Sequence, residues 1–185
     1  MVLIVCALAG ELQGYDTLVT GVGKINAALT LTRFLAENPN PPAVINLGSA
    51  GGVGLPKGSL VRATNFNQWD MRCEGLDFRR GQTPFDNVPA QIDSTYDIQI
   101  NGLVDAPCYT NDQFLDDPLL LPTGPSVVEM EAFALAKVCN AFSVPFGAVK
   151  YVTDCADEAA SRDWQEALPG CAITLGDVAD RILNP

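Results

Sequence analysis

Acidic side chains follow several apolar runs of this chain, at the points where strands are expected to end. Glu11 follows the first apolar run and Asp154 ends the last one. Glu129 and Glu131 end a shorter run that starts at Ser126. Ligands of open α/β sheets bind beyond the carboxyl ends of the strands, so we expect these carboxylates at the binding edge. The sequence contains no histidine, which excludes His-based triads and histidine metal sites.

Carboxylates around one ligand, with aromatic side chains nearby, suit the cleavage of an N-glycosidic bond. The transition state of that reaction resembles an oxocarbenium ion, which nearby negative charge stabilises. One carboxylic acid can protonate the leaving base, and a second carboxylate can activate water. A third can bind the ribose hydroxyls, and a Phe or Trp ring can stack on a flat base. This chemistry needs no metal and no cofactor, and we predict none.

Length and composition predict one globular domain, residues 1–185, in a reducing compartment. The hydrophobic fraction is 48% and the charged fraction 18%, which allows a large core. The net charge of −11 argues against nucleic acid and membrane surfaces as partners. Six cysteines without CxxC spacing predict free thiols and a cytoplasmic location. The opening MVLIVCALAG is too short to span a bilayer and is predicted to be a buried strand.

Apolar periodicity predicts strands alternating with helices. The expected strands cover 2–8, 16–20, 43–48, 58–66, 95–101, 103–110 and 146–154, and a further short strand opens 126–139. Helices are expected at 24–37, in the second part of 126–139, and at 158–183 with a break near Pro169. Residues 49–52 and 67–88 are predicted to be loops. The alternation predicts an α/β fold, a three-layer α/β/α sandwich around a mixed, mainly parallel sheet.

The same residues also have ordinary structural interpretations. Glu11 alone can be a solvated turn residue, and Glu129 a first-turn carboxylate favoured by a helix dipole. Asp154 could cap the helix that follows it, although Asp157 is better placed for that role. The default place for an aromatic residue such as Phe114 or Trp164 is the core.

Four segments together resemble the purine and uridine phosphorylase superfamily. They are TGVGKINAAL (20–29), NLGSAGG (46–52), VVEMEAFALAKVC (127–139) and VPFGAVKYVTDCAD (144–157). The resemblance runs along most of the chain and is strongest to the hydrolytic branch, the 5′-methylthioadenosine/S-adenosylhomocysteine nucleosidases. It implies a nucleoside phosphorylase-like fold, a small-molecule nucleoside substrate, no cofactor and a homodimer.

The resemblance also implies a role for each candidate residue. Glu11 matches the carboxylate that activates the attacking water, and Asp154 matches the acid that protonates the purine N7. Glu131 matches the ribose ligand, whereas Glu129, two residues away, should point elsewhere and help to position the site. Phe78 and Pro84 match residues that reach into a neighbouring subunit's site. The remaining substrate-binding residues implied are Leu8, Ser49, Ala50, Gly51, Phe114, Leu115, Met130, Thr153 and Trp164.

The resemblance further predicts water as the nucleophile. Phosphorylases of the superfamily bind phosphate with arginines near the N-terminus and just before the GS loop, but residues 7–10 and 46–47 contain no arginine. Shortened segments at 12–15 and between Phe114 and Val128 border the pocket and leave the 5′ group and the base open. Three alternatives remain: a phosphorylase, an inactive nucleoside-binding module and a flavodoxin-like electron carrier.

Overall fold

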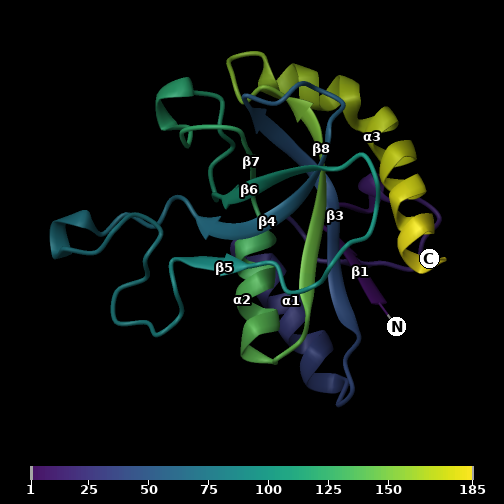
Figure 1. Cartoon of the computed structure of the whole chain (residues 1–185), viewed down its shortest axis with the longest axis horizontal. Helices are drawn as coiled ribbons and strands as arrows, with labels where there is room; N and C mark the ends of the chain where they lie inside the picture. The colour runs from purple at the N-terminus through teal and green to yellow at the C-terminus, as the bar shows by residue number, and fades with distance from the viewer. Residues whose placement is uncertain (1, 185) are drawn as a thin grey trace.

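The computed structural model describes residues 2–184, except for the side chain of Pro118, and shows one mixed β-sheet with helices packed against it (Figure 1). The strands are β1 (Val2–Cys6), β2 (Leu18–Val19), β3 (Ala43–Val53), β4 (Leu60–Gln68), β5 (Gln91–Asp93), β6 (Val104–Thr110), β7 (Ser126–Glu129) and β8 (Phe146–Asp154). The helices are α1 (Lys24–Glu37), α2 (Ala132–Ala141) and α3 (Ala160–Leu183), and short 3₁₀ turns cover η1 (Ala9–Glu11), η2 (Glu74–Leu76) and η3 (Pro118–Leu120). Within residues 2–184, no helix is long and apolar enough to cross a membrane.

The predicted α/β class with a mixed, mainly parallel sheet is confirmed, and the sheet also closes on itself. The pairs β1–β2, β1–β3, β3–β8, β4–β6 and β6–β7 are parallel, and β3–β7, β4–β5 and β4–β8 are antiparallel. Strands β3, β8, β4, β6 and β7 therefore form a closed ring, with β1 and β2 attached outside β3 and β5 attached outside β4. The predicted strand pattern contained no indication of this closure.

Side-chain alternation along the strands sorts the core into two clusters. Val44 of β3 packs in the cluster that contains the buried faces of α1 and α2, whereas its neighbour Ile45 packs in the cluster that contains α3. Successive side chains of a strand point to opposite faces. Helices α1 and α2, which contact each other, thus cover one face of the sheet, and α3 covers the other (Figure 1).

Three local predictions were wrong. The predicted loop at 49–52 is strand, because β3 continues to Val53 between β7 and β8. Residues 95–101 are not a strand, although Ile98 is buried in the α3 cluster as its alternating pattern suggested. Helix α3 continues through Pro169, since residues on both sides of it are buried, Ala160 before it and Cys171 and Leu175 after it, and this packing holds the helix together. The long loop predicted at 67–88 is confirmed apart from its first two residues and the short turn η2.

Candidate active site

A cavity of about 310 Å³ opens where β1, β3, β7 and β8 end. All but two of the predicted site residues line it, namely Leu8, Glu11, Ser49, Ala50, Gly51, Phe114, Leu115, Glu129, Met130, Glu131, Asp154 and Trp164. The two exceptions are Phe78 and Thr153, whose hydroxyl donates a hydrogen bond to the Asp154 carboxyl group. The structure thus brings together residues that lie as far apart in the sequence as Leu8 and Trp164.

Glu11 is the last residue of η1, and three hydrogen bonds fix its carboxylate. The side chain is only 3% exposed. Its Oε1 accepts hydrogen bonds from the backbone N of Ser49 at 2.9 Å and from the Ser49 hydroxyl at 2.8 Å. Its Oε2 accepts one from the backbone N of Leu8 at 3.1 Å. Glu11 is therefore a buried cavity residue and not a solvated turn residue.

Asp154 ends β8 and presents its carboxyl group to the same cavity. Burial raises its pKa above the ordinary value, and hydrogen bonds from the Thr153 hydroxyl and the backbone N of Ala156 oppose that rise only in part. Asp157 is not the cap of the next helix, because the N-cap of α3 is Ala159 and has no side-chain hydrogen bond, but its side chain does accept a hydrogen bond from the backbone N of Ala159. Asp154 remains available to a ligand.

Gly51 of β3 makes room for the Asp154 carboxyl group. A Cβ at Gly51 would lie 2.8 Å from Asp154 Oδ1 and 3.1 Å from a methyl group of Val128. Contacts under 3 Å do not occur for real Cβ atoms, so a side chain at this position would displace its neighbours. The resemblance implied a substrate-binding role for Gly51, and the structure shows that the group closest to it is the carboxyl group of a second strand.

Glu131 lies at the N-terminal end of α2, and its carboxylate faces the cavity. Its Oε1 accepts a hydrogen bond from the backbone N of Gly23 at 2.8 Å. Gly23 has φ +89°, a conformation that favours glycine and that turns this N–H toward Glu131. Burial, and then the charge of Glu129, raise the pKa of Glu131 from 4.5 to about 7.

Glu129 ends β7 and has mainly structural contacts. Its Oε2 accepts hydrogen bonds from the backbone N of Glu131 at 3.0 Å and of Ala132 at 2.8 Å, at the start of α2. Its Oε1 accepts one from the Thr110 hydroxyl. The expectation that Glu129 and Glu131 have different partners agrees with these contacts, and Glu129 holds the turn that positions Glu131.

Lys150 is the main residue at this site that the sequence analysis missed. It lies in β8, is 1% exposed, and its Nζ is 3.0 Å from Glu129 Oε2. A Cβ at Gly48 would lie 3.3 Å from Glu11 Oε1 and 3.6 Å from Lys150 Nζ, so both charges border this one glycine. Burial is the largest single influence on the pKa of Lys150 and works to lower it, but the surrounding negative charges, Glu129 first, together outweigh burial and raise this pKa above its usual value. The lysine inside the apolar run FGAVKYV could have identified this residue from the sequence, because a buried charge needs a partner.

The predicted aromatic residues lie at the rim of the cavity. Phe114 is 41% exposed, so it is not the core aromatic of the ordinary interpretation, and the neighbouring Leu115 is buried against Val128. Trp164 of α3 donates a hydrogen bond from Nε1 to the Ser49 hydroxyl at 3.1 Å. Further lining residues that the sequence analysis did not single out are Ala7, Val22, Gln113, Val128, Ser161 and Gln165.

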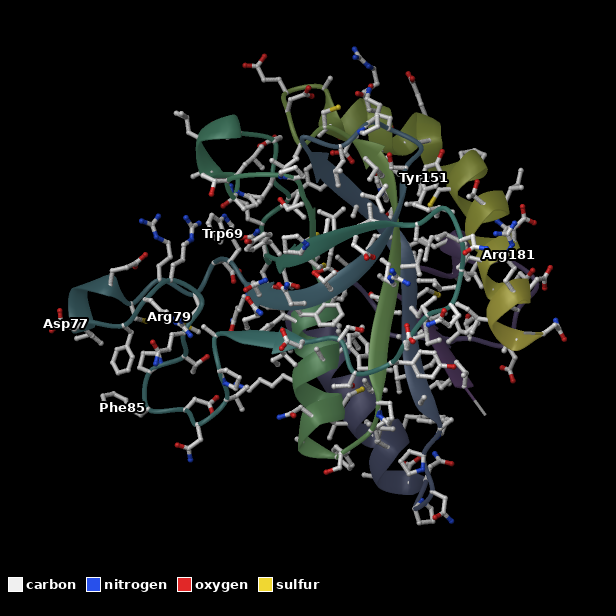
Figure 2. All side chains as sticks on the ribbon, viewed as in Figure 1. Trp69, Asp77, Arg79, Phe85, Tyr151 and Arg181 are labelled. Atoms are coloured by element: carbon white, nitrogen blue, oxygen red, sulfur yellow. The ribbon has the colours of Figure 1, made fainter. Side chains whose placement is uncertain are left out.

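Phe78 lies outside this cavity, in the long segment between β4 and β5. Its ring packs edge-on against Phe85, with centroids 5.4 Å apart. Asp77, Arg79 and Phe85 mark the end of this segment, which projects from the body of the molecule (Figure 2). Within residues 2–184, no group of three or more histidine, cysteine or acidic side chains is arranged to hold a metal ion.

Comparisons with known proteins identify the family of this fold. The family model of the phosphorylase superfamily matches residues 8–184. The 5′-methylthioadenosine/S-adenosylhomocysteine nucleosidase of Haemophilus ducreyi is 31% identical over 184 residues, covering 90% of this chain and 78% of that protein. The enzyme of the same name from Bacillus subtilis is 30% identical over 196 residues, covering 95% of this chain and 84% of that protein.

Solved structures agree on the fold. The Neisseria meningitidis nucleosidase of the same name, in complex with methylthio-immucillin-A, superposes with a TM-score of 0.83 at 24% identity, covering 98% of this chain and 97% of that one. A mutant futalosine hydrolase of Helicobacter pylori superposes with a TM-score of 0.88 at 20% identity, covering 99% and 98%. By its sequence match and its relatives, the chain belongs to the phosphorylase superfamily.

Proposed function

We propose that this protein hydrolyses the N-glycosidic bond of a purine nucleoside to the free base and a ribosyl product. The observation that carries the proposal is the convergence of Glu11, Glu131 and Asp154 on one cavity. The sequence relatives are named as 5′-methylthioadenosine/S-adenosylhomocysteine nucleosidases. We therefore infer that adenine-type nucleosides with an apolar 5′ group are the preferred substrates.

The three carboxyl groups divide the reaction between them. Asp154, whose pKa is raised by burial, donates a proton to the purine N7 as the bond from C1′ to the base breaks and its electron pair leaves with the base. Glu11 removes a proton from the water whose oxygen forms the new bond to C1′. Glu131 accepts hydrogen bonds from the ribose hydroxyls, and the negative charge around the sugar stabilises the oxocarbenium-like transition state. Phe114 offers its ring to the base.

Water, and not phosphate, is the nucleophile in this proposal. No arginine or lysine is among the residues found to line the cavity. The nearby Lys150 is buried and paired with Glu129, which leaves it no exposed surface for an anion. Phosphate recognition needs charged or backbone donors that face the ligand. We expect release of free base at the same rate with and without phosphate, and a strict phosphate requirement would show a phosphorylase instead.

The direct test of the mechanism is Asp154→Asn. This change keeps the size of the side chain and removes the proton donor, so kcat should fall by roughly 10²- to 10⁴-fold, the usual contribution of a general acid. Asp16→Asn is the matched control, since Asp16 is exposed and lies away from the cavity. Release of adenine from 5′-methylthioadenosine is the assay. Normal turnover by the Asp154 variant would remove this residue from the mechanism.

We also propose that two copies of the chain form a homodimer through the segment between β4 and β5. Phe85 is 91% exposed and Leu76 is 63% exposed on this segment. Such exposure of neighbouring large apolar side chains is unusual in a monomer. By family resemblance, Phe78 and Pro84 of this segment would extend toward the partner's cavity. Sedimentation should give a dimer for the wild type and a weaker dimer for Phe85→Ser. A wild type that stays monomeric at working concentrations would refute this assembly.

We further propose that the protein is cytoplasmic and forms a single functional domain, residues 1–185. The six cysteines of the chain are all free, which supports a cytoplasmic location. All of the strands join one sheet and the site draws on both ends of the chain, which supports a single functional domain.

A further inference from the structure

A chain of hydrogen bonds leads from α3 to the proposed general base. The indole Nε1 of Trp164 lies 3.1 Å from the Ser49 hydroxyl oxygen, and that oxygen lies 2.8 Å from Glu11 Oε1. Ser49 belongs to β3, whereas Trp164 lies in the early part of α3. The next residue toward the N-terminus, Asp163, is held by an ion pair with Lys57, which anchors this part of the helix.

The donors and acceptors fix the direction of this chain. An indole N–H can only donate a hydrogen bond, and an ionised carboxylate can only accept. The Ser49 hydroxyl therefore receives its hydrogen bond from Trp164 and directs its single proton toward Glu11. A hydroxyl that accepts a hydrogen bond also becomes a stronger donor. Trp164 thus orients and strengthens the contact between Ser49 and Glu11.

The two oxygens of Glu11 are left in different situations by these contacts. Oε1 receives both the Ser49 hydroxyl and the Ser49 backbone N–H. Oε2 receives only the backbone N–H of Leu8, at the longer distance of 3.1 Å. Oε2 is consequently the oxygen with accepting capacity left for a water molecule. This chain of hydrogen bonds, the Trp164–Ser49–Glu11 relay, keeps the Glu11 carboxylate from rotating and exchanging the positions of its two oxygens.

We propose that Trp164 is a positioning residue for the general base, acting through the Ser49 hydroxyl on Glu11. This role differs from lining the cavity, which needs the apolar face of the Trp164 ring but not its N–H. The proposal deepens the function proposed above and rests on it. It makes the indole N–H, and not the aromatic surface alone, a determinant of the rate.

A double-mutant cycle with 5′-methylthioadenosine separates the two roles. Trp164→Phe keeps an aromatic ring and removes the N–H, and Ser49→Ala removes the atom through which Trp164 acts. We expect Trp164→Phe to lower kcat by about 3- to 10-fold, the effect of one hydrogen bond, with little change in KM. In the Ser49→Ala background the same change should have almost no further effect on kcat. Independent, multiplying losses, or a rise in KM alone, would overturn the proposal.

A spectroscopic measurement tests the relay without any turnover. The chain has two tryptophans, so the ¹H–¹⁵N spectrum contains two indole signals, and Trp164→Phe assigns them. Ser49→Ala should move the Trp164 indole proton upfield, and Glu11→Gln should move it in the same direction by a smaller amount. The Trp69 signal serves as internal control, since its N–H donates to the backbone oxygen of Leu120. An unmoved Trp164 signal would refute the relay, whereas a normal relay in a protein that cleaves no nucleoside would refute only the proposed function.

Discussion

Replacing Glu131 by glutamine should change how the stability of the ligand-free protein depends on pH. The pKa of Glu131 rises from 4.5 in the unfolded chain to about 7 in the folded protein, because of burial and then the charge of Glu129. The folded state therefore holds a proton on Glu131 that the unfolded state has lost between these two values. Stability from this group is complete below the lower value and is lost as pH rises through the upper one.

The size of this effect follows from the two pKa values of Glu131. Each pH unit between them is worth about 1.36 kcal/mol, which makes the full effect about 3 kcal/mol, and most of this change falls between about pH 5 and pH 8. Glutamine has no proton to lose, so the stability of Glu131→Gln should fall less over this range than that of the wild type. Only 6% of Glu131 is exposed, so solvent screening reduces the effect little.

Urea unfolding of both proteins over this pH range measures the difference in the free energy of unfolding. Contributions from the other titrating groups cancel to a first approximation when the two proteins are compared at each pH. Met130→Leu is the control, because it changes the neighbouring cavity residue without removing a titratable group. If the difference between the wild type and Glu131→Gln stays constant from acid to base, the reasoning about burial and the Glu129 charge is wrong.

Two further substitutions test the packing around the carboxyl groups. Gly51→Ala should lower kcat by about 10- to 100-fold, because its Cβ would displace Asp154 and a small misplacement of a reacting group is costly; Gly170→Ala, which meets nothing within 4 Å and lies away from the cavity, should turn over normally in the same assay, and equal rates for both would contradict the argument. Lys150→Met should lower the free energy of unfolding in urea by about 3–5 kcal/mol, because it leaves the Glu129 charge buried without a partner; adding Glu129→Gln should restore part of the loss, and a further loss instead would show that the pair is not coupled.

The sequence was most informative where local periodicity and burial agree. Helix α1 covers the predicted 24–37, and Leu31 and Leu35 of its apolar pattern are buried, whereas Ile25 and Leu29 of the same pattern are exposed. The predicted break at Pro169 failed, since packing along α3 outweighs the local preference of one residue. The alternating apolar side chains of 95–101 do pack in the core, but the backbone of this segment pairs with no strand of the sheet.

The site was predictable in its members but not in its contacts. The predicted strand ends placed the carboxylates at one edge of the sheet, and the family resemblance implied the roles of Glu11 and Asp154. Nothing local in the sequence pairs Lys150 with Glu129, because that contact joins two strands that reach each other only through the folded sheet. The link between Trp164 and Ser49 is equally non-local, since it spans more than a hundred residues.

The closed ring of β3, β8, β4, β6 and β7 determines which parts of the sequence can vary without loss of catalytic activity. Ser49, Glu129, Lys150 and Asp154 all belong to ring strands, and a ring has no free edge along which one strand can slide past another. We therefore expect substrate entry to depend on parts outside the ring that border the cavity, such as the segment that carries Phe114. Variation in those outer parts can alter which nucleoside is accepted, while Asp154 and Ser49, the residue that holds Glu11, keep their spacing.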